Sequence, residues 1–506
     1  MNGIFNSLTI GFGVAFSPLN LLVAALGAFI GTFVGALPGL GPINGVAMLV
    51  PIAFAMQLPP ETSLILLAAV YVGAEYGGRI SSILLNVPGE AAAVMTTLDG
   101  HPLARKGLAN VALSISAWAS FIGSTIAVFG ILAFAPFLVK WAIAFGPSEY
   151  FVLMVFAFVA LTSLLGDHPV KGAVGALIGL AISTVGVDAN SGVYRYTFDI
   201  PNLSDGIAFI VVVIGLFAVS EMLQMLEKLL AGYTIEVPKS TRKIFSLREL
   251  AFTWWATIRA GVSGFIIGIL PGAGASIASA VAYANEKKLC ESKNQASEFG
   301  QGDLRGLVAP ESANNAAATG SFIPMLTLGV PGSGTTAVMM GALTLYNITP
   351  GPVLFDQQPT IVWGLIASLF IANLMLLFMN IPLVGVFAST LRIAPWILVP
   401  AILSISFIGV YALNGTIFDL ITVAVIGGVG YFLRKFDVPL APMVLGVVLG
   451  NLMEQNLRRA LSISNGDINI LFESTICIVL WALIVGVLVI PPILRKWMNA
   501  KNAPAN

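Results

Sequence analysis

The sequence predicts an all-α polytopic membrane protein, built as two inverted repeats with broken helices or re-entrant hairpins. Three observations lead to this fold class. Of the 506 residues, 57% are hydrophobic and only 9% are charged, whereas soluble domains carry roughly 25% charged residues. Apolar runs long enough to cross a bilayer recur along the chain. Motifs rich in glycine and proline interrupt these runs, and they occur in the same order in each half.

The uninterrupted apolar runs have the length of a membrane-spanning helix, which needs about 17–25 residues. We expect spans near residues 19–37, 109–138, 147–165, 169–187, 206–227, 251–270, 360–385, 395–412, 416–433, 440–456 and 471–493. Broken apolar stretches lie between them, at residues 42–58, 62–104, 272–285 and 307–347. These stretches are rich in Gly, Pro, Ser, Thr and Asn, so we expect the broken helices there.

Two pairs of matching motifs indicate an internal duplication. PGLGPING at residues 38–45 matches PGAGASIA at residues 271–278. LLNVPGEAAAVMTT at residues 84–97 matches TLGVPGSGTTAVMM at residues 327–340. The weaker matches are GPSEYF at 146 with APWILV at 394, the span 169–187 with the span 416–433, and AVSEMLQML at 218 with NLMEQNLRR at 451. Because the order is the same in both halves, one structural unit is expected to occur twice.

The distribution of charge predicts how the repeats cross the membrane. The predicted domains are residues 1–235, the first transmembrane repeat, and residues 236–506, the second repeat with an extra C-terminal helix. The linker 228–250 is basic and is placed in the cytoplasm, whereas the acidic loop 188–205 is placed outside. Matched spans then cross in opposite directions, so the halves are predicted to be inverted copies. Lys140 and the adjacent arginines 458 and 459 go against this rule.

Each Pro-Gly break can end one helical segment and start another, since proline lacks an N–H donor and glycine allows the turn. Irregular backbone at membrane depth is tolerated only inside the protein or against a water-filled cavity. The restarting helix directs free N–H groups and its positive dipole end at that cavity, where a carboxylate binds well. Four such breaks predict one anion site near the bilayer midplane. The alternative is that they are packing kinks, because Gly and Pro are common in transmembrane helices.

The predicted substrate- or ion-binding site consists of the break residues and the small hydrogen-bonding side chains around them. Its members are Gly39, Gly41, Asn44, Asn86, Pro88, Gly89, Gly272, Gly274, Ser276, Asn314, Asn315, Pro331, Gly332, Ser333, Thr335 and Thr336. Such groups can bind carboxylate oxygens or, with backbone carbonyls, a sodium ion. Alternatively, they make hydrogen bonds and close contacts between helices. We expect the matched tip glycines Gly89 and Gly332 to face a cavity and not a packed core.

Ionisable residues inside apolar stretches indicate function, because each costs about 2.5–3.5 kcal/mol at the bilayer centre on insertion scales. Glu75 and Arg79 are four residues apart and share a helix face, so we expect an intramembrane charge pair. Alternatively, Arg79 grips a substrate carboxylate. Glu90 follows the first VPG motif and is either a helix-capping charge or a cation or proton site. The next ionisable residues are expected in a solvated loop, namely Asp99, His101, Arg105 and Lys106.

Other functional classes lack the sequence features that they need. The formal net charge is zero, so no basic excess is present to bind nucleic acid. Cys290 and Cys477 lie far apart and the two histidines lie in unrelated contexts, so no metal site is predicted. The PGSGTT segment at 331 lacks the Lys-Ser/Thr of a phosphate-binding loop. No catalytic residues are assigned. A membrane-embedded enzyme or a scaffold is therefore the weaker alternative.

The run YGGRISSILLNVPGEAAAVMTTLDGHPLARKG, residues 76–107, resembles the signature of the large membrane subunit of tripartite tricarboxylate transporters. GALPGLGP from Gly35, PGAGAS from Pro271 and GVPGSGTTA from Gly329 are also similar to that family. The resemblance covers nearly the whole chain and implies a permease of the bacterial inner membrane with about twelve spans. It also implies two partners, a small membrane subunit and a periplasmic solute-binding protein.

The resemblance further implies secondary active transport, driven by an ion gradient and not by ATP. Substrates of the family are typically citrate and other di- or tricarboxylates. We therefore expect a multi-pass protein in contact with membrane lipid that carries a small carboxylate in symport with Na⁺ or H⁺, with no other cofactor. A stand-alone anion carrier without a binding protein is the alternative within transport. The family implies no particular site residues, so the site above rests on the sequence pattern alone.

Overall fold

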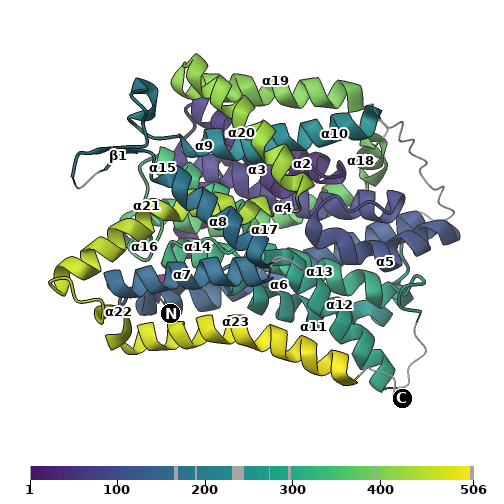
Figure 1. Ribbon diagram of the computed structural model, residues 1–506. Coiled ribbons are helices and arrows are strands. Elements are labelled where there is room, and N and C mark those ends of the chain that lie inside the picture. The colour runs from purple at the N-terminus through teal and green to yellow at the C-terminus, as the bar shows by residue number, and fades with distance from the viewer. Residues whose placement is uncertain are drawn as a thin grey trace. The chain divides into compact units, whose positions relative to one another are not determined.

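The chain folds almost entirely into helices, which confirms the predicted all-α class (Figure 1). The computed structural model describes residues 2–164, 169–188, 191–230, 244–272, 274–293, 298–391 and 395–501. Within these ranges the only strands are β1 (Gly186–Val187) and β2 (Tyr194–Arg195), which form a short antiparallel pair. The predicted boundary between the repeats, after residue 235, lies outside the described residues.

The helices occur in the following order along the chain. In the first half they are α1 (Asn2–Ala15), α2 (Pro18–Ala36), α3 (Gly41–Ala55), α4 (Pro60–Leu85), η1 (Ala91–Ala93), α5 (Val94–Leu103), η2 (Ala104–Leu108), α6 (Ala109–Ala142), α7 (Pro147–Leu164), α8 (Pro169–Ser183), η3 (Pro201–Leu203), α9 (Phe209–Val213), η4 (Ile214–Val219) and α10 (Ser220–Leu230). In the second half they are α11 (Leu247–Ile269), α12 (Gly274–Ser292), α13 (Leu304–Gly320), α14 (Phe322–Leu328), α15 (Gly334–Leu345), α16 (Leu354–Gln357), α17 (Pro359–Asn380), α18 (Val384–Thr390), α19 (Pro395–Asn414), α20 (Ile417–Lys435), α21 (Leu440–Ile463), α22 (Ile470–Glu473) and α23 (Thr475–Lys501).

The chain forms two compact units, and each of them takes segments from both halves of the sequence. The first unit comprises Met1–Val139 and Ala208–Leu433. The second comprises Lys140–Ile207 and Arg434–Asn506. These units are not the two predicted repeats, because a repeat is a continuous half of the chain whereas a unit is a set of segments that contact one another.

Helix α4 is the buried centre of the first unit, and α2 lies along it at very short distance. A methyl group added at Gly31 would lie 2.3 Å from the Val70 carbonyl oxygen, and one at Gly35 would lie 2.0 Å from that of Ala74. Glycine on α2 therefore allows the two backbones to touch. The apolar 18-residue window of α4 is buried over its full length, so its polar side chains face other helices and not lipid.

Helices α11 and α13 repeat this packing in the second half. A methyl group at Gly264 would lie 2.4 Å from the Ala313 carbonyl oxygen, and one at Gly268 would lie 2.4 Å from that of Ala317. A Pro-Gly break follows α11 as another follows α2. The same local arrangement thus occurs once in each half, which agrees with the duplication inferred from the motifs.

The later helices exchange partners between the halves. In the second unit, α21 packs on α7 and α8, and a methyl group at Gly179 of α8 would lie 2.0 Å from the Met443 carbonyl oxygen. In the first unit, α20 packs on η4, and a methyl group at Gly427 would lie 2.3 Å from the Val219 side chain. Because α8 matches α20 in sequence, two matched helices each pack against helices of the other half. This swap also agrees with a duplication, whereas the inverted orientation stays a prediction.

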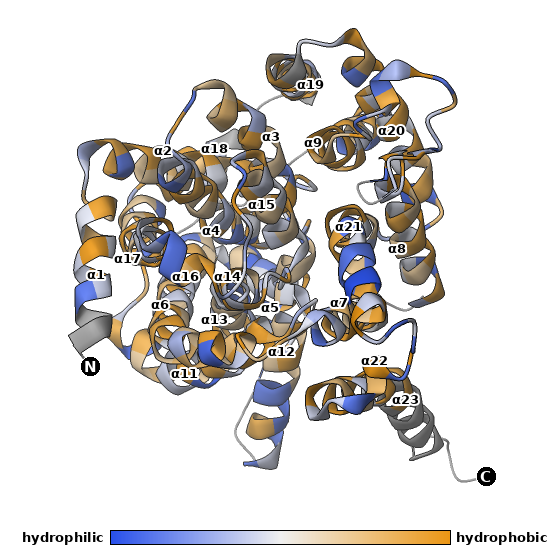
Figure 2. Cartoon of the chain, turned by 90° about the vertical axis from the view of Figure 1, so that its left-hand side faces the viewer, coloured by the Kyte–Doolittle hydropathy of each residue, from blue (hydrophilic) through white to orange (hydrophobic). Residues whose placement is uncertain are grey.

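Eight helices are long and apolar enough to cross a membrane, and five shorter apolar helices accompany them in the part of the chain that the structure describes. Figure 2 shows the apolar colouring along most of these helices. The chain is therefore a multi-pass membrane protein, whereas the number of about twelve spans stays a prediction. Helix α1 lies outside the expected spans, and its Gly11 packs against the backbone of Trp363 on α17.

Candidate functional site

A helix ends and another begins at each of the four Pro-Gly motifs. In the first half, α2 stops at Ala36 and α3 restarts at Gly41, where the backbone is left-handed with φ of 59°. Gly39 between them is left-handed as well, with φ of 87°, which is a conformation that glycine adopts at little cost. The second break follows α4, which ends on left-handed Asn86, and Glu90 is extended before η1 begins.

The second half contains the equivalent pair of breaks. Helix α11 ends at Ile269 and α12 begins at Gly274. Helix α14 ends on left-handed Gly329, and α15 begins at Gly334 after the N-cap residue Ser333. The Ser333 hydroxyl accepts a hydrogen bond from the Thr336 N–H at 3.2 Å, so this helix start has its own capping group.

The two breaks of each half touch one another. In the first half, a methyl group at Gly41 would lie 3.5 Å from Glu90 Cβ and 3.9 Å from the Gly89 carbonyl oxygen. In the second half, the Gly272 N–H donates a hydrogen bond of 3.2 Å to the Gly332 carbonyl oxygen. The PGxG break therefore lies against the VPG break twice, once in each half.

Helices α4 and α13 connect the two pairs of breaks. The Tyr71 hydroxyl on α4 lies 3.1 Å from Ser333 Oγ in the second-half break. One turn later, Glu75 lies close to Glu90 of the first-half break and to Asn314 on α13. Asn314 Nδ2 also donates to Glu90 Oε1 at 3.2 Å. We call these five residues, Tyr71, Glu75, Glu90, Asn314 and Ser333, the central polar cluster.

The central polar cluster is buried at its base and partly exposed at its tips. Tyr71, Glu75 and Asn314 have exposed fractions of 1%, 2% and 1%, whereas Glu90 and Ser333 at the break tips are partly exposed. Glu75 Oε2 and Asn314 Oδ1 have no hydrogen-bond partner among the described residues. An unsatisfied buried polar atom costs about 1–3 kcal/mol, so such atoms point to a ligand, an ion or a water.

The predicted charge pair between Glu75 and Arg79 is wrong. The Arg79 guanidinium donates to the Tyr76 carbonyl oxygen and, at 3.1 Å, to Asn380 Oδ1 on α17. The carboxylate whose charge acts on Arg79 is that of Glu311 on α13, and not that of Glu75. A spacing of four residues places two side chains on one helix face, but both are long enough to turn toward different neighbours. Arg79 is also fully buried among these groups, which speaks against its alternative role as a substrate grip.

Glu311 is a buried acid that the sequence pattern missed. Its carboxylate accepts hydrogen bonds from the Thr96 hydroxyl and, at 3.3 Å, from Ser120 Oγ. Predicted Asn315 joins this group, because its Nδ2 donates to Ser120 Oγ at 2.9 Å. Glu311 lies in the broken stretch 307–347, so its position in an apolar stretch was a usable signal. The sequence also contained a signal for Tyr71, since this residue precedes Glu75 by one helical turn.

Other predicted residues occupy different surroundings. Asn44 is buried and its Nδ2 donates to the Leu40 carbonyl oxygen, at the start of its own helix. Asn86 is exposed and lines a separate hollow of about 550 Å³ with Thr97 and His101. The structure therefore does not bring Asn86 to the central polar cluster. The remaining predicted residues lie at the breaks themselves or in the first turn after them, namely Pro88, Pro331, Ser276 and Thr335.

The tip glycines do not face open space, contrary to the expectation. A methyl group at Gly89 would lie 2.4 Å from the Gly35 carbonyl oxygen. One at Gly332 would lie 2.8 Å from the Cα atom of Ser321. Both tips are thus pressed against backbone, because the break has to fit between closely packed helices. Their side-chain positions serve packing, whereas their peptide groups contact the neighbouring break.

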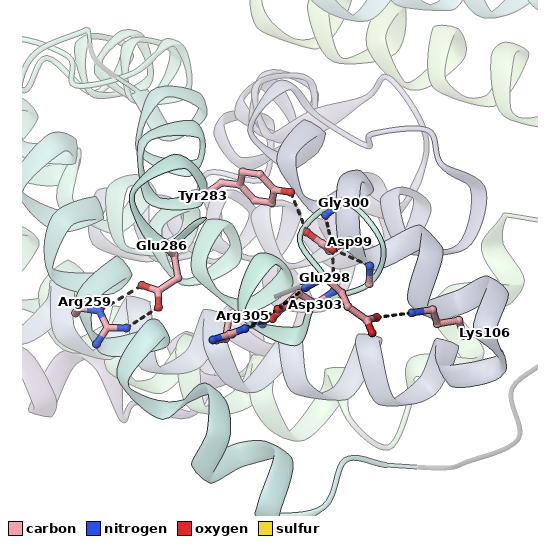
Figure 3. A network of polar contacts seen from close by, with 10 residues as sticks. Asp99, Lys106, Arg259, Tyr283, Glu286, Glu298, Gly300, Asp303 and Arg305 are labelled. Carbon is pink, nitrogen blue, oxygen red and sulfur yellow. Dashed lines mark hydrogen bonds and ion pairs between the residues drawn. The ribbon is translucent and has the colours of Figure 1, made fainter. Parts of the chain in front are cut away.

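Asp99 is also placed differently from the expectation of a solvated loop. Figure 3 shows its carboxylate at the centre of a polar network between α5, α12 and the segment before α13. Asp99 Oδ1 accepts hydrogen bonds of 2.8 Å from the backbone N–H groups of Gly300, Gly302 and Asp303, and Oδ2 accepts one of 3.0 Å from Tyr283. The carboxylate is fully buried. It therefore connects segments of the two halves through hydrogen bonds and is not a solvated charge.

A family model described as the tripartite tricarboxylate transporter TctA family matches residues 21–445. An uncharacterized 52.8 kDa protein in the TAR-I ttuC' 3' region of Agrobacterium vitis is 40% identical over 467 residues, which cover 92% of each chain. An uncharacterized protein in the TAR-II ttuC' 3' region of the same organism is 46% identical over 213 residues, which cover 42% of this chain and 87% of that one. No solved structure matches.

Proposed function

Because this chain belongs to the tripartite tricarboxylate transporter TctA family, we propose that it is the large permease subunit of a binding-protein-dependent carboxylate transporter. It moves citrate or another di- or tricarboxylate across the bacterial inner membrane, and a Na⁺ or H⁺ gradient drives the movement. A small membrane subunit and a periplasmic solute-binding protein are its partners, and the latter delivers the substrate.

The observation that carries this proposal is the meeting of the breaks around α4. Three helices of at least twelve residues, α3, α12 and α15, begin at these breaks. The N-terminus of a helix offers free N–H groups and a positive dipole end, which suit a carboxylate. A substrate with two or three carboxylates can use more than one such helix start, so several breaks in one place favour a polyanion over a neutral solute.

Two other functions make different demands on the site. A stand-alone anion carrier would use the same breaks but would need no binding protein. A membrane-embedded enzyme would need an acid, a base or a metal that faces a bound substrate. In the central polar cluster the acids contact each other and an amide, an arrangement that suits binding and release of a cation or proton better than bond cleavage.

The test is uptake of radiolabelled carboxylates by proteoliposomes that contain this chain and its small membrane partner, with and without the binding protein. We expect accumulation of at least one di- or tricarboxylate, only with the binding protein, and only under a Na⁺ or pH gradient. Uptake without the binding protein would favour the stand-alone carrier. If monodisperse protein with both partners accumulates no carboxylate under either gradient, the proposed function is wrong.

A matched pair of variants links transport to the breaks. Ser333→Ala removes the hydroxyl that contacts Tyr71 and caps α15. Ser389→Ala removes an exposed hydroxyl on α18 that bonds only to its own helix. We expect Ser333→Ala to raise the substrate concentration needed for half-maximal uptake, whereas Ser389→Ala should not. Equal uptake by both variants would mean that the second-half break is not part of the substrate site.

A further inference from the structure

The contact between Glu75 and Glu90 is unusual, because two carboxylates repel each other unless something positive lies between them. Glu75 projects from the middle of α4, and Glu90 reaches it from the break that follows α4. Gly78 makes room for this approach, since a methyl group there would lie 3.0 Å from Glu90 Cγ and 3.1 Å from Glu90 Oε1. The Glu90 side chain therefore lies flat on the same helix that carries Glu75.

Asn314 gives an independent indication of what the pair binds. Its Nδ2 donates to Glu90 Oε1, but its Oδ1 has no partner among the described residues although only 1% of the side chain is exposed. A buried amide oxygen needs a donor or a cation. Glu75 lies close to the same amide and has an unpartnered Oε2. A protonated carboxyl in this place would supply one of the donors that these acceptors lack.

The surrounding charges do not neutralise the pair. Arg79 is the nearby cation on α4, but it donates to Tyr76 and Asn380, and the carboxylate that acts on its charge is that of Glu311. From α13, Glu311 adds a further negative charge toward Glu75. Tyr71 faces the pair from the preceding turn of α4. On the side of the first break, Glu221 of α10 lies against Gly39. Two ionised carboxylates would therefore leave excess negative charge beside the breaks.

We propose that Glu75 and Glu90 form the coupling site of the transporter and bind one proton between them, and this rests on the proposed carboxylate transport. A polyanionic substrate at the breaks is repelled by the ionised pair and tolerated by the protonated pair. Substrate and proton therefore bind cooperatively, and each raises the affinity for the other by the same factor. The proton enters with the substrate from one side, leaves with it on the other side, and is not consumed.

The experiment separates coupled accumulation from exchange in proteoliposomes that contain the complete transporter. Accumulation under a pH gradient needs net proton movement, whereas exchange of labelled for unlabelled substrate does not. Glu75→Gln and Glu90→Gln imitate the protonated pair, so exchange should continue within roughly threefold of wild type. Accumulation should fall at least about tenfold, and the dependence of exchange on pH should disappear. Glu298→Gln, at an exposed acid paired with Lys106, should behave like wild type.

A second variant tests the geometry without removing a carboxyl group. Gly78→Ala places a methyl group against the Glu90 side chain, so it should push Glu90 away from Glu75 and weaken the coupling. We expect a shift in the pH profile of exchange with little change in the amount of monodisperse protein. Gly428→Ala, where an added methyl group meets no atom within 4 Å, is the matched control.

A direct readout is the proton uptake that accompanies citrate binding to the purified complex in weakly buffered solution with an indicator dye. Wild type should take up about one proton per citrate bound, and the two Gln variants should take up none. Accumulation that follows only a Na⁺ gradient, or normal coupling in both Gln variants, would overturn the assignment. Loss of exchange in both variants would place the pair in substrate binding instead. If wild type itself moves no carboxylate, the proposed function fails and not this site alone.

Discussion

The hydroxyl of Tyr71 lies 3.1 Å from Ser333 Oγ, so a helix of the first half reaches the VPG break of the second half. The same hydroxyl lies 3.3 Å from Ser321 Oγ. Tyr71 and Ser333 are 262 positions apart in the chain. The contact makes Tyr71 the counterpart of Glu75, which reaches the first-half break from the next turn of the same helix. Helix α4 is thus a common support for both breaks.

Replacing Tyr71 with Phe should weaken transport more than it weakens the fold. The ring keeps its packing against Phe322, whose centroid is 5.7 Å away, while the hydrogen bond to the break is lost. A hydrogen bond contributes about 0.5–1.5 kcal/mol, so we expect roughly 2- to 10-fold weaker substrate affinity. Tyr346→Phe removes a similar contact to Ser63 Oγ at 2.7 Å and is the control. The measurement is concentration-dependent uptake together with thermal unfolding, and similar affinity losses in both variants would contradict the role of Tyr71.

Replacing Gly332 with Ala should reduce the amount of folded protein. The added methyl group would lie 2.8 Å from the Cα and Cβ atoms of Ser321, and overpacking of this kind typically costs about 1–3 kcal/mol. Gly428→Ala on α20 meets no atom within 4 Å and should be neutral or stabilise the helix by roughly 0.4–1 kcal/mol. Thermal unfolding of the purified variants in detergent compares the two. An unchanged unfolding temperature for Gly332→Ala would mean that the tip has free space, as the sequence suggested.

Replacing Arg79 with Leu should destabilise the first unit, and Glu311 is the residue whose neutralisation should restore stability. The substitution leaves the Tyr76 carbonyl oxygen and Asn380 Oδ1 without their donor and leaves Glu311 without its cation. Removing one member of a buried charged group costs about 3–5 kcal/mol.

The double variants decide which acid is the electrostatic partner of Arg79. Adding Glu311→Gln should recover part of the lost unfolding temperature, whereas adding Glu75→Gln should recover less. The readout is fluorescence-detected size-exclusion after heating. Equal recovery by the two additions would revive the pairing of Glu75 with Arg79 that the spacing suggests.

The breaks could be predicted from the sequence because they depend on local chemistry. A proline cannot donate to the preceding turn and a glycine accepts positive φ, so Pro38-Gly39 or Pro331-Gly332 stops a helix wherever it lies. The match between the halves then indicated which breaks belong together. The pairing of the Gly272 N–H with the Gly332 carbonyl oxygen agrees with that local signal.

The side-chain partners could not be predicted, because they depend on packing between distant segments. Asp99 stands in a polar run and looks solvated, yet its acceptors are filled by N–H groups about two hundred residues later, such as that of Gly300. Glu75 and Arg79 share a face, but the helix rule does not give the direction in which either long side chain turns. The position of Glu311 close to Arg79 follows only from the crossing of α13 and α4.

The segment before α13 should become less stable in acid, because the pKa of Asp303 is lowered in the folded protein. Burial alone would raise the pKa of Asp303, but hydrogen bonds from the Arg305 side chain and from the Arg305 and Glu298 N–H groups hold its pKa below the usual value. A lowered folded pKa means that the ionised acid favours folding. This contribution is complete above the unfolded pKa of about 4 and is lost as the pH falls through the lower folded pKa.

Hydrogen exchange of the amides in residues 298–305 measures this effect. Protection should decrease as the pH is lowered from about 5 to about 3, after correction for intrinsic exchange. Asp303→Asn should lower protection already at neutral pH and flatten the dependence. Asp356→Asn, at an exposed acid in α16, should leave it unchanged. A wild-type profile with no pH dependence would mean that the Asp303 carboxylate does not hold this segment.

The last prediction concerns the side of the membrane on which the loop 188–205 lies. Its acidic character placed it outside, and Arg458 counted against that orientation. In the second unit, Arg458 donates to Asp188 Oδ2 at 2.8 Å and lies close to Glu454. Arg195 also binds Glu454 at 2.8 Å. Because the positive-inside rule counts Lys and Arg and not net charge, these ion pairs do not decide the orientation, which has to be measured.

Single cysteines at exposed positions test the orientation. Ser191 and Lys288 are both exposed, and the native Cys290 and Cys477 are buried and can be replaced first. In intact cells, Ser191→Cys should react with an impermeant thiol reagent added to the periplasm, and Lys288→Cys should react only after the membrane is opened. Labelling of the disrupted cells shows that both cysteines are reactive. The reverse pattern would invert the orientation, and labelling of both from the periplasm would break the assignment that makes the two halves inverted copies.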